Sequence, residues 1–395
     1  MEVKPGYKKT EAGVIPKDWE AVSLGSFVAL QRGYDLTWRH RRAGNVPVMG
    51  SAGPNGFHDT SIAKGPGVVV GRSGASFGKA HYCEHDFWPH NTVLYVTDFY
   101  GNNPLFVFYL LTSLDFSSYN SGGAQQSLNR NFIASIVVGV PRLQEQHAIA
   151  TALSEVDALL RSLDHLIDKK RDIKRGAMQQ LLTGQTRLPG FHDEWEMKRV
   201  GDFTTCTAGG TPSTSVPHYW DGPIRWMSSG ELNLKYVHDV AGRITEAGLK
   251  SSSAKMLPPR CVLIGLAGQG KTRGTSAMNL VSLCTNQSIA AIFPGDSFVS
   301  EYLYFNFDAR YDELRELSAG DGGRGGLNLR LIKSIAVPFP SIPEQSAIAA
   351  VLSEIDTELM ILELRREKTR ALKLAMMQEL LTGKTRLIPP GGSHG

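Results

Sequence analysis

The chain contains 395 residues, of which 42% are hydrophobic, and carries a formal net charge of +4. This length suits two to three domains, and the apolar fraction excludes a wholly disordered protein. The four cysteines are too scattered for a disulfide framework and form no CxxC pair that could hold structural zinc. The sequence has no apolar leader and no run of about 18 apolar residues, so we expect a cytoplasmic protein without a membrane span.

Residues 1–143 have the pattern of a mixed α/β domain. Short β-rich runs occur at 67–71 and 92–96, and a helical pattern follows at 104–114. A glycine-rich loop at 121–126 precedes a further strand-like run. We expect this block to be the first of two globular domains.

Residues 144–184 predict a long amphipathic helix, which would measure about 60 Å. Its apolar residues recur at alternating steps of four and three, the spacing of a coiled-coil seam. They are Ile149, Leu153, Val156, Leu160, Leu163 and Ile167. Lys170 and Lys174 interrupt the seam, and Gly184 stands where a glycine commonly ends a helix.

Residues 185–341 predict a second mixed α/β domain with β-rich runs at 261–265 and 288–293. Residues 342–384 then repeat the first helix, and 385–395 form a tail. At a constant offset of 199, the helix segments share 23 identities in 45 positions, as a comparison of 144–188 with 343–387 shows. Ser341 and Glu344 have the spacing of a capping box at the start of the second helix.

The fold class is therefore α/β (α+β), with two globular mixed α/β domains joined by two long antiparallel coiled-coil helices. A single amphipathic helix cannot bury its apolar stripe alone, and the other copy is the simplest partner. Antiparallel pairing would place the two globular blocks at opposite ends of a strut. About 60 Å corresponds to at most about 17 base pairs of B-DNA.

Three repeated features resemble the specificity subunit of type I restriction–modification systems. Each helix starts with P-x-x-x-E-Q, each ends with L-L-T-G-x-T-R-L, and each block opens on a W-E pair, at Trp19 and Trp195. The resemblance covers essentially the whole chain. It implies two target-recognition domains, at 1–143 and 185–341, which each read one half of a split site in double-stranded DNA. The helices would set the spacing.

The resemblance also implies partners and a non-catalytic role. Two methyltransferase (modification) subunits would bring S-adenosylmethionine, and restriction (translocase/nuclease) subunits would bring ATP-driven cleavage with Mg²⁺. An adenine methyltransferase of the partner type should carry an N/D-P-P-Y/F tetrad. The two Pro-Pro pairs, at 258–259 and 389–390, do not fit it.

DNA contacts are expected from loops that combine arginine or lysine with amides, since bidentate arginine recognises guanine and amides recognise adenine. In the first block the candidates are Arg39, Arg41, Arg42, Lys79, Gln125, Gln126 and Arg130. In the second block they are Arg225, Lys271, Arg273 and Arg324. Partner binding is expected at Glu145, Gln146, Glu344 and Gln345, which the two copies share.

Two other function classes compete with this interpretation. Residues 265–272 match the phosphate-loop pattern G-x-x-x-x-G-K-[ST], so Lys271 and Thr272 would suit a nucleotide-binding enzyme. A phosphate loop needs a following helix, whereas the next residues predict a loop and a strand, which favours a structural or DNA-facing turn. The chain could also be a coiled-coil scaffold without a DNA role. His81, Cys83 and His85 match no usual zinc spacing, and we expect no metal.

Overall fold

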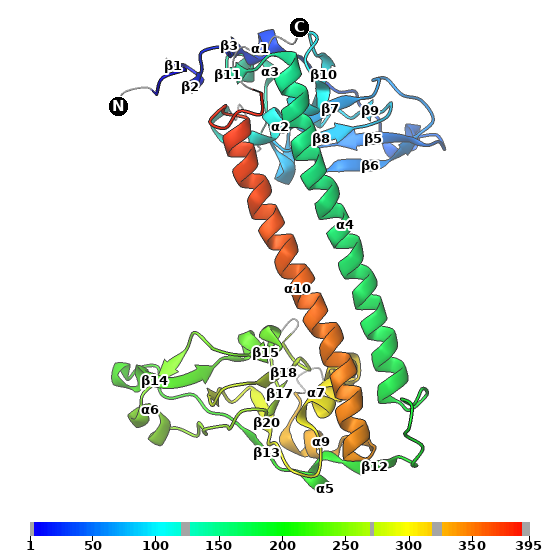
Figure 1. The fold of residues 1–395 in the computed structure, drawn as a ribbon, viewed down its shortest axis with the longest axis vertical. Helices are drawn as coiled ribbons and strands as arrows, with labels where there is room; N and C mark the ends of the chain where they lie inside the picture. Colours follow the sequence, from blue (N-terminus) through cyan, green and yellow to red (C-terminus); the bar gives the residue numbers. More distant parts are fainter. Residues whose placement is uncertain (1–3, 120–126, 269–271, 318–325, 389–395) are drawn as a thin grey trace. The chain divides into compact units, whose positions relative to one another are not determined.

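The computed structural model describes residues 4–119, 127–268, 272–317 and 326–388. The chain divides into two compact units (Figure 1). The first contains Met1–Asp164 and Leu364–Gly395, and the second contains His165–Glu363. Each unit therefore combines one globular domain with parts of both long helices. Packing groups the chain differently from the linear segments expected from the sequence, because each domain packs against both helices.

The globular part of the first unit is built on an antiparallel sheet with the strand order β4-β10-β7-β8. Its strands are β4 (Ala29–Arg32), β7 (Gly67–Gly71), β8 (Ala80–Cys83) and β10 (Val93–Asp98). A second sheet contains β5 (Val46–Gly50), β6 (Gly53–His58) and β9 (Trp88–Pro89), and two strand pairs contain β1 (Tyr7–Thr10) with β2 (Gly13–Pro16) and β3 (Glu20–Ser23) with β11 (Val137–Val140). The short helices are α1 (Leu24–Phe27), α2 (Pro104–Ser113) and α3 (Arg130–Ile133).

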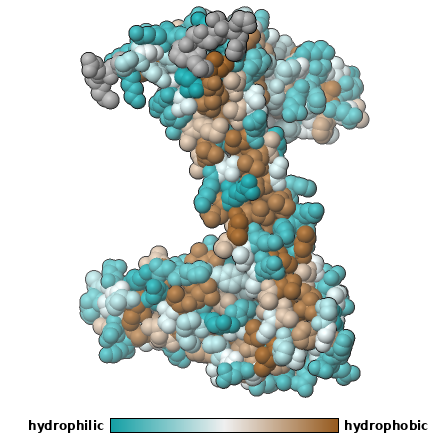
Figure 2. All heavy atoms as spheres, in the orientation of Figure 1, coloured by the Kyte–Doolittle hydropathy of each residue, from teal (hydrophilic) through white to brown (hydrophobic). Residues whose placement is uncertain are grey.

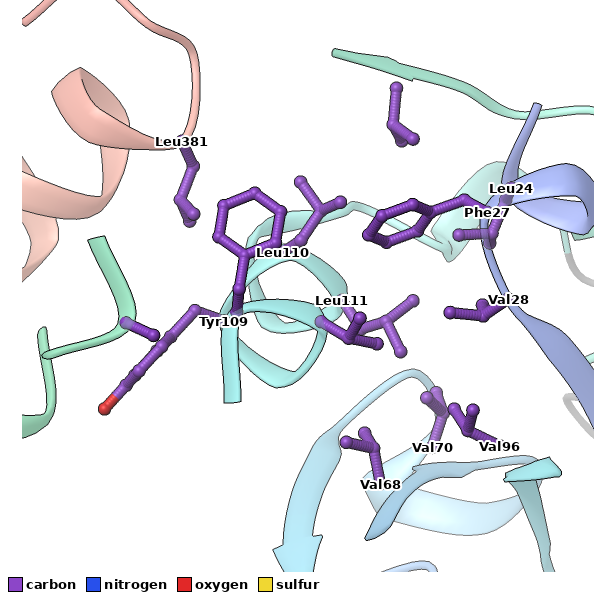
Figure 3. Close-up of a cluster of buried hydrophobic side chains, with 14 of the residues drawn as sticks. Leu24, Phe27, Val28, Val68, Val70, Val96, Tyr109, Leu110, Leu111 and Leu381 are labelled. Atoms are coloured by element: carbon purple, nitrogen blue, oxygen red, sulfur yellow. The ribbon is translucent and has the colours of Figure 1, made fainter. Parts of the chain in front are cut away.

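The core of this domain forms around α2. This helix is apolar on nearly every side, so it is buried rather than half exposed. Tyr109, Leu110 and Leu111 of α2 share a core with Val68 and Val70 of the sheet (Figure 3). Leu381, from the chain just after the second long helix, belongs to the same core. The first domain therefore requires the segment at the end of α10 to complete its interior.

The globular part of the second unit repeats this sheet. Its main sheet has the order β13-β20-β17-β18-β15, and β13-β20-β17-β18 correspond to β4-β10-β7-β8. The strands of the main sheet are β13 (Cys206–Ala208), β15 (Tyr236–Val237), β17 (Val262–Gly265), β18 (Ser276–Asn279) and β20 (Ile289–Ile292). A smaller sheet contains β14 (Trp220–Met227), β16 (Arg243–Ile244) and β19 (Cys284–Thr285). A separate strand pair contains β12 (Glu196–Arg199) and β21 (Ala336–Phe339). The helices are α5 (Val200–Phe203), α6 (Glu246–Lys250), α7 (Ser300–Ala309), α8 (Tyr311–Leu317) and α9 (Leu329–Ser334).

The two long helices are α4 (Leu143–Leu182) and α10 (Ile342–Leu380). In the first unit, Leu153 near the start of α4 shares a core with Leu380 at the end of α10. In the second unit, Leu352 near the start of α10 shares a core with Leu181 at the end of α4. The segments therefore run antiparallel within each unit, which confirms the expected pairing. The helix-ending glycines are confirmed too, because Gly184 (φ +73°) and Gly383 (φ +70°) adopt left-handed backbone.

Part of α10 presents large apolar side chains to solvent, and Figure 2 shows apolar surface along the helices. The exposed residues are Met360, Ile361, Leu364, Leu372 and Leu374. Exposed apolar patches of this kind often mark protein–protein contacts. Among the described residues, no helix is both long and apolar enough to cross a membrane.

Candidate nucleic-acid interface

The start of α4 is held by a buried carboxylate in the first unit. Glu145 is only 3% exposed. It accepts a hydrogen bond of 3.0 Å from the indole of Trp19 and two, of 2.6 and 2.8 Å, from the guanidinium of Arg386. The same guanidinium donates to both oxygens of Asp18 at 2.8 Å. These contacts join the opening of the first domain, the start of α4 and the segment after α10.

The second unit repeats the arrangement at the start of α10. Glu344, which is 1% exposed, accepts hydrogen bonds of 2.6 and 2.8 Å from Arg187 and one of 2.9 Å from Trp195. In the 199-residue repeat, Glu344 corresponds to Glu145, and Arg187 corresponds to Arg386. The carboxylate of Glu344 does not form the capping box that the sequence predicted with Ser341. Its oxygens accept hydrogen bonds from Arg187 and Trp195 instead.

The glutamine that follows each glutamate is equally buried. The side-chain oxygen of Gln146 accepts from the backbone N–H of Asn103 at 3.0 Å, and that of Gln345 accepts from Val299 at 2.9 Å. Each side-chain nitrogen donates to the carbonyl oxygen five residues earlier. These bonds fix the start of α2 or α7 against a long helix. Bonds inside the chain thus give a reason why both copies of the repeat keep the Glu-Gln pair. Contact of these four side chains with a partner subunit stays a prediction.

The Asp18 contact predicts a pH dependence of stability. The hydrogen bond from Arg386 holds the pKa of Asp18 below its ordinary value of 3.8. A lowered folded-state pKa stabilises the protein above the unfolded-state pKa, and this contribution is lost as the pH falls through the folded-state value. Asp18→Asn should therefore lower stability at pH 6, and the difference from wild type should shrink below about pH 4. Urea unfolding between pH 6 and pH 2.5 measures this. A difference that is constant across this range would contradict the prediction.

A second repeated contact is a lysine–aspartate pair between the helices. Lys174, whose side chain is 9% exposed, lies 2.7 Å from Asp356 and 3.1 Å from Asp308, and Tyr236 donates to Asp356 at 3.1 Å. Burial lowers the pKa of Lys174, but the two carboxylates outweigh burial and raise the pKa above its ordinary value. The seam interruption at Lys174 is thus an internal ion pair.

The equivalent contact in the first unit uses residues at the same repeat positions. Lys373 lies 2.6 Å from Asp157, and the hydroxyl of Tyr109 donates to Asp157 at 2.7 Å. Both Lys373 and Asp157 are 21% exposed, so this pair is more hydrated than Lys174 with Asp356. The two units therefore use one polar design to dock a domain on the helices.

The predicted arginine cluster of the first domain lies on the surface around a 3-10 helix, η1 (Trp38–His40). Trp38 is 77% exposed, and the guanidinium of Arg39 lies 5.8 Å from the centre of its ring. Arg42 is paired with Asp59 at 2.6 Å, and Arg41 donates to the carbonyl oxygen of Asn55. Arg39 and Trp38 are therefore the members most open to an external ligand.

The described part of the phosphate-loop match, residues 265–268 and 272, lies between β17 and β18. The backbone N–H of Gly265 donates to Thr275, and that of Gly274 donates back to Gly265. The first domain has the same two bonds, between Gly71 and Lys79 and between Gly78 and Gly71. The next element after the match is β18, a strand, so the helix N-terminus that a phosphate loop requires is not there. A turn therefore fits this segment and a nucleotide-binding phosphate loop does not, while contact of the turn with DNA stays a prediction. Lys271 itself lies outside the described residues.

Comparison with known proteins gives the family. The model of the type I restriction modification DNA specificity domain matches residues 16–169 and 192–369, one match for each predicted half. The chain belongs to this specificity family. It is a type I restriction–modification specificity subunit with two DNA-recognition domains, and neither the nucleotide-binding nor the scaffold alternative finds support.

The relatives agree with this assignment. The MjaIX specificity subunit of Methanocaldococcus jannaschii is 32% identical over 177 residues, which cover 44% of this chain and 40% of the relative. The MjaVIII specificity subunit of the same organism is 22% identical over 72% of this chain and 70% of its own length. The crystal structure of a type I S subunit from M. genitalium shares the fold, with a TM-score of 0.68 over 96% of this chain and 98% of that one, at 15% identity.

The remaining residues predicted to contact DNA in this specificity subunit differ in their exposure and in their ion pairs. Lys79 and Arg130 are exposed in the first domain. Arg225 is paired with Asp239 at 2.8 Å, and Arg273 is half-buried with an interaction of its own. Gln125, Gln126, Lys271 and Arg324 lie outside the described residues. Contact of these side chains with DNA stays a prediction.

The sequence analysis did not identify two pairs of arginines. Arg187 and Arg386 occupy the same position of the repeat, so the repeat itself could have indicated their shared role. Arg32 and Arg72 are isolated in the sequence, and only strand register brings them to one face. Within the part of the chain that the structure describes, no group of three or more histidine, cysteine or acidic side chains is placed to hold a metal ion.

Proposed function

We propose that this specificity subunit is non-catalytic and reads a bipartite site in double-stranded DNA, with each domain recognising one half. The proposal rests on one observation: the two units share their internal architecture, here called the frame, but not the sequences of their exposed loops. Both units keep the strand order and the Glu–Arg–Trp and Lys–Asp contacts to the helices. The exposed loops of the domains differ in sequence. A shared frame with different surfaces suits two readers of different sequences.

The long helices would set the distance between the half-sites. Each contains about 40 residues, so each is about 60 Å long. We propose further that two methyltransferase subunits bind the chain and supply S-adenosylmethionine, and that restriction subunits supply ATP- and Mg²⁺-dependent translocation and cleavage. The exposed apolar residues of α10 support binding of protein partners. The cytoplasm, where the DNA lies, is the expected location.

A domain exchange tests this function. Replacing residues 1–143 by the equivalent domain of a relative should change one half of the methylated site and leave the other half and the junction contacts of the second unit intact. Mapping methylated adenines in cells that carry the wild-type or the exchanged chain measures this. The reciprocal exchange of residues 185–341 is the matched control and should change the other half. A change of both half-sites by a single exchange would refute the modular assignment.

A further inference from the structure

Two arginines come together at one end of the main sheet of the first domain. Arg32, the last residue of β4, is paired with Leu94 of β10, which is paired on its other side with Val70 of β7. Arg72 follows Val70 by two residues, so it lies on the same face as Arg32. Two strand spacings separate β4 from β7, about 10 Å, which two long side chains can span.

The backbone holds Arg72 rigidly at this position. Its N–H donates to the carbonyl oxygen of Thr92 at 2.8 Å, and its own carbonyl accepts from Leu128 at 2.8 Å. Arg130 follows two residues later on α3, which lies against β4. The backbone of Arg72 is therefore held on both sides, and Arg130 lies on an element next to the sheet.

Nothing in the described part of the chain neutralises this pair. Neither Arg32 nor Arg72 has a side-chain hydrogen bond or an ion pair there, unlike Arg42 with Asp59. Burial and the charge of Arg32 both lower the pKa of Arg72, and no carboxylate opposes them. An arginine remains charged despite such a shift. Two like charges held on one face cost stability unless an anion binds between them.

The second domain shows that the frame does not need these arginines. Leu266 occupies the position of Arg72, because its N–H donates to Ser288 and its carbonyl accepts from Leu327 in the same pattern. Ala208 occupies the position of Arg32, because it is paired with Ala290, the neighbour of Ile264. An alanine and a leucine therefore fill the same places in an equivalent sheet. The arginine pair is particular to the first domain.

We propose that Arg32 and Arg72 bind adjacent phosphate groups of the DNA backbone at the first half-site. This inference rests on the proposed DNA-reading function. A dense line of negative charge is the ligand that two unpaired guanidinium groups fit, and arginine binds phosphate through paired N–H donors. Strand ends fix the register of the domain on the duplex, and base contacts come from other loops.

The matched variant takes its residues from the second domain. Arg32→Ala combined with Arg72→Leu, in the full chain purified with its methyltransferase subunits, should bind cognate duplex at least about tenfold more weakly. The slope of log affinity against log salt should decrease by about 1.8, since each lost phosphate contact removes about 0.9. Thermal stability should be unchanged or higher, because the change removes a like-charge pair. Lys17→Ala combined with Lys64→Ala removes two exposed charges elsewhere in the unit and should leave the slope nearly unchanged.

Three outcomes would overturn the assignment. The arginine variant binding with wild-type affinity and salt slope excludes a contact. An unchanged slope with altered base preference in the first half-site would make the arginines base readers. An equal effect of the lysine variant would show only a general charge effect. A wild-type complex that binds no duplex with salt dependence would instead refute the proposed function.

Discussion

Glu344→Ala is expected to lower the free energy of unfolding of the second unit by about 3 kcal/mol, the cost of breaking a buried ion pair by removing one partner. The carboxylate is 1% exposed and accepts three hydrogen bonds from Arg187 and Trp195. Its loss leaves the guanidinium of Arg187 and the half-buried indole N–H of Trp195 without their acceptor. The effect is measured by urea unfolding of the full chain.

Glu363→Ala is the matched control on the same helix. Glu363 is paired with Arg171 at 2.6 Å, but their side chains are 42% and 49% exposed. Exposed pairs contribute at most about 1 kcal/mol. Amide hydrogen exchange should locate the effect of Glu344→Ala at the start of α10 and around Arg187 and Trp195. Equal destabilisation by the two substitutions would show that the buried carboxylate has no special role.

Lys174→Ala should destabilise the second unit by a similar amount, about 3 kcal/mol. Among the described residues, the substitution leaves Asp356, whose side chain is 7% exposed, with Tyr236 as its side-chain hydrogen-bond donor. It also leaves Asp308 facing Asp356 without the cation between them. Two neighbouring carboxylates repel each other, so we expect the junction between the domain and α4 to loosen first.

Two lysines serve as graded controls for Lys174. Lys170 lies one turn earlier on α4 and is paired with Glu358, with exposures of 29% and 46%, so Lys170→Ala should cost less than about 1 kcal/mol. Lys373→Ala in the first unit should fall between the two, because Lys373 and Asp157 are each 21% exposed. Thermal and urea unfolding of the three variants should give this order. If Lys170→Ala were as costly as Lys174→Ala, burial would not be the cause.

Much of the architecture follows from the sequence because the two helices repeat. The seam spacing predicted both long helices, and the left-handed Gly184 and Gly383 were recognisable as helix ends. The phosphate-loop match was separable from a true phosphate loop, since the residues after Gly274 lack a helical pattern. The resemblance to the specificity family depended on the same repeated motifs and is confirmed by the family match.

The roles of individual polar residues were less accessible. Partner contact by Glu145 and Gln146 stays a prediction, but the sequence did not indicate that their side chains are buried and bonded within the first unit. Retention between copies shows that a residue matters, but burial decides whether it faces inward. The sequence does not predict whether a polar side chain is buried, because its hydrogen-bond partners come from distant segments.

The sequence by itself therefore determined the duplicated plan, the two helices and the family, since these depend on spacing along one chain. Only the tertiary structure decided that Arg386 completes the first domain, 368 residues from Asp18, and that Arg32 and Arg72 share a sheet face. Helix periodicity is a local property that a short segment expresses alone. Ion pairs and strand register join segments whose separation in the sequence carries no information about their distance in space.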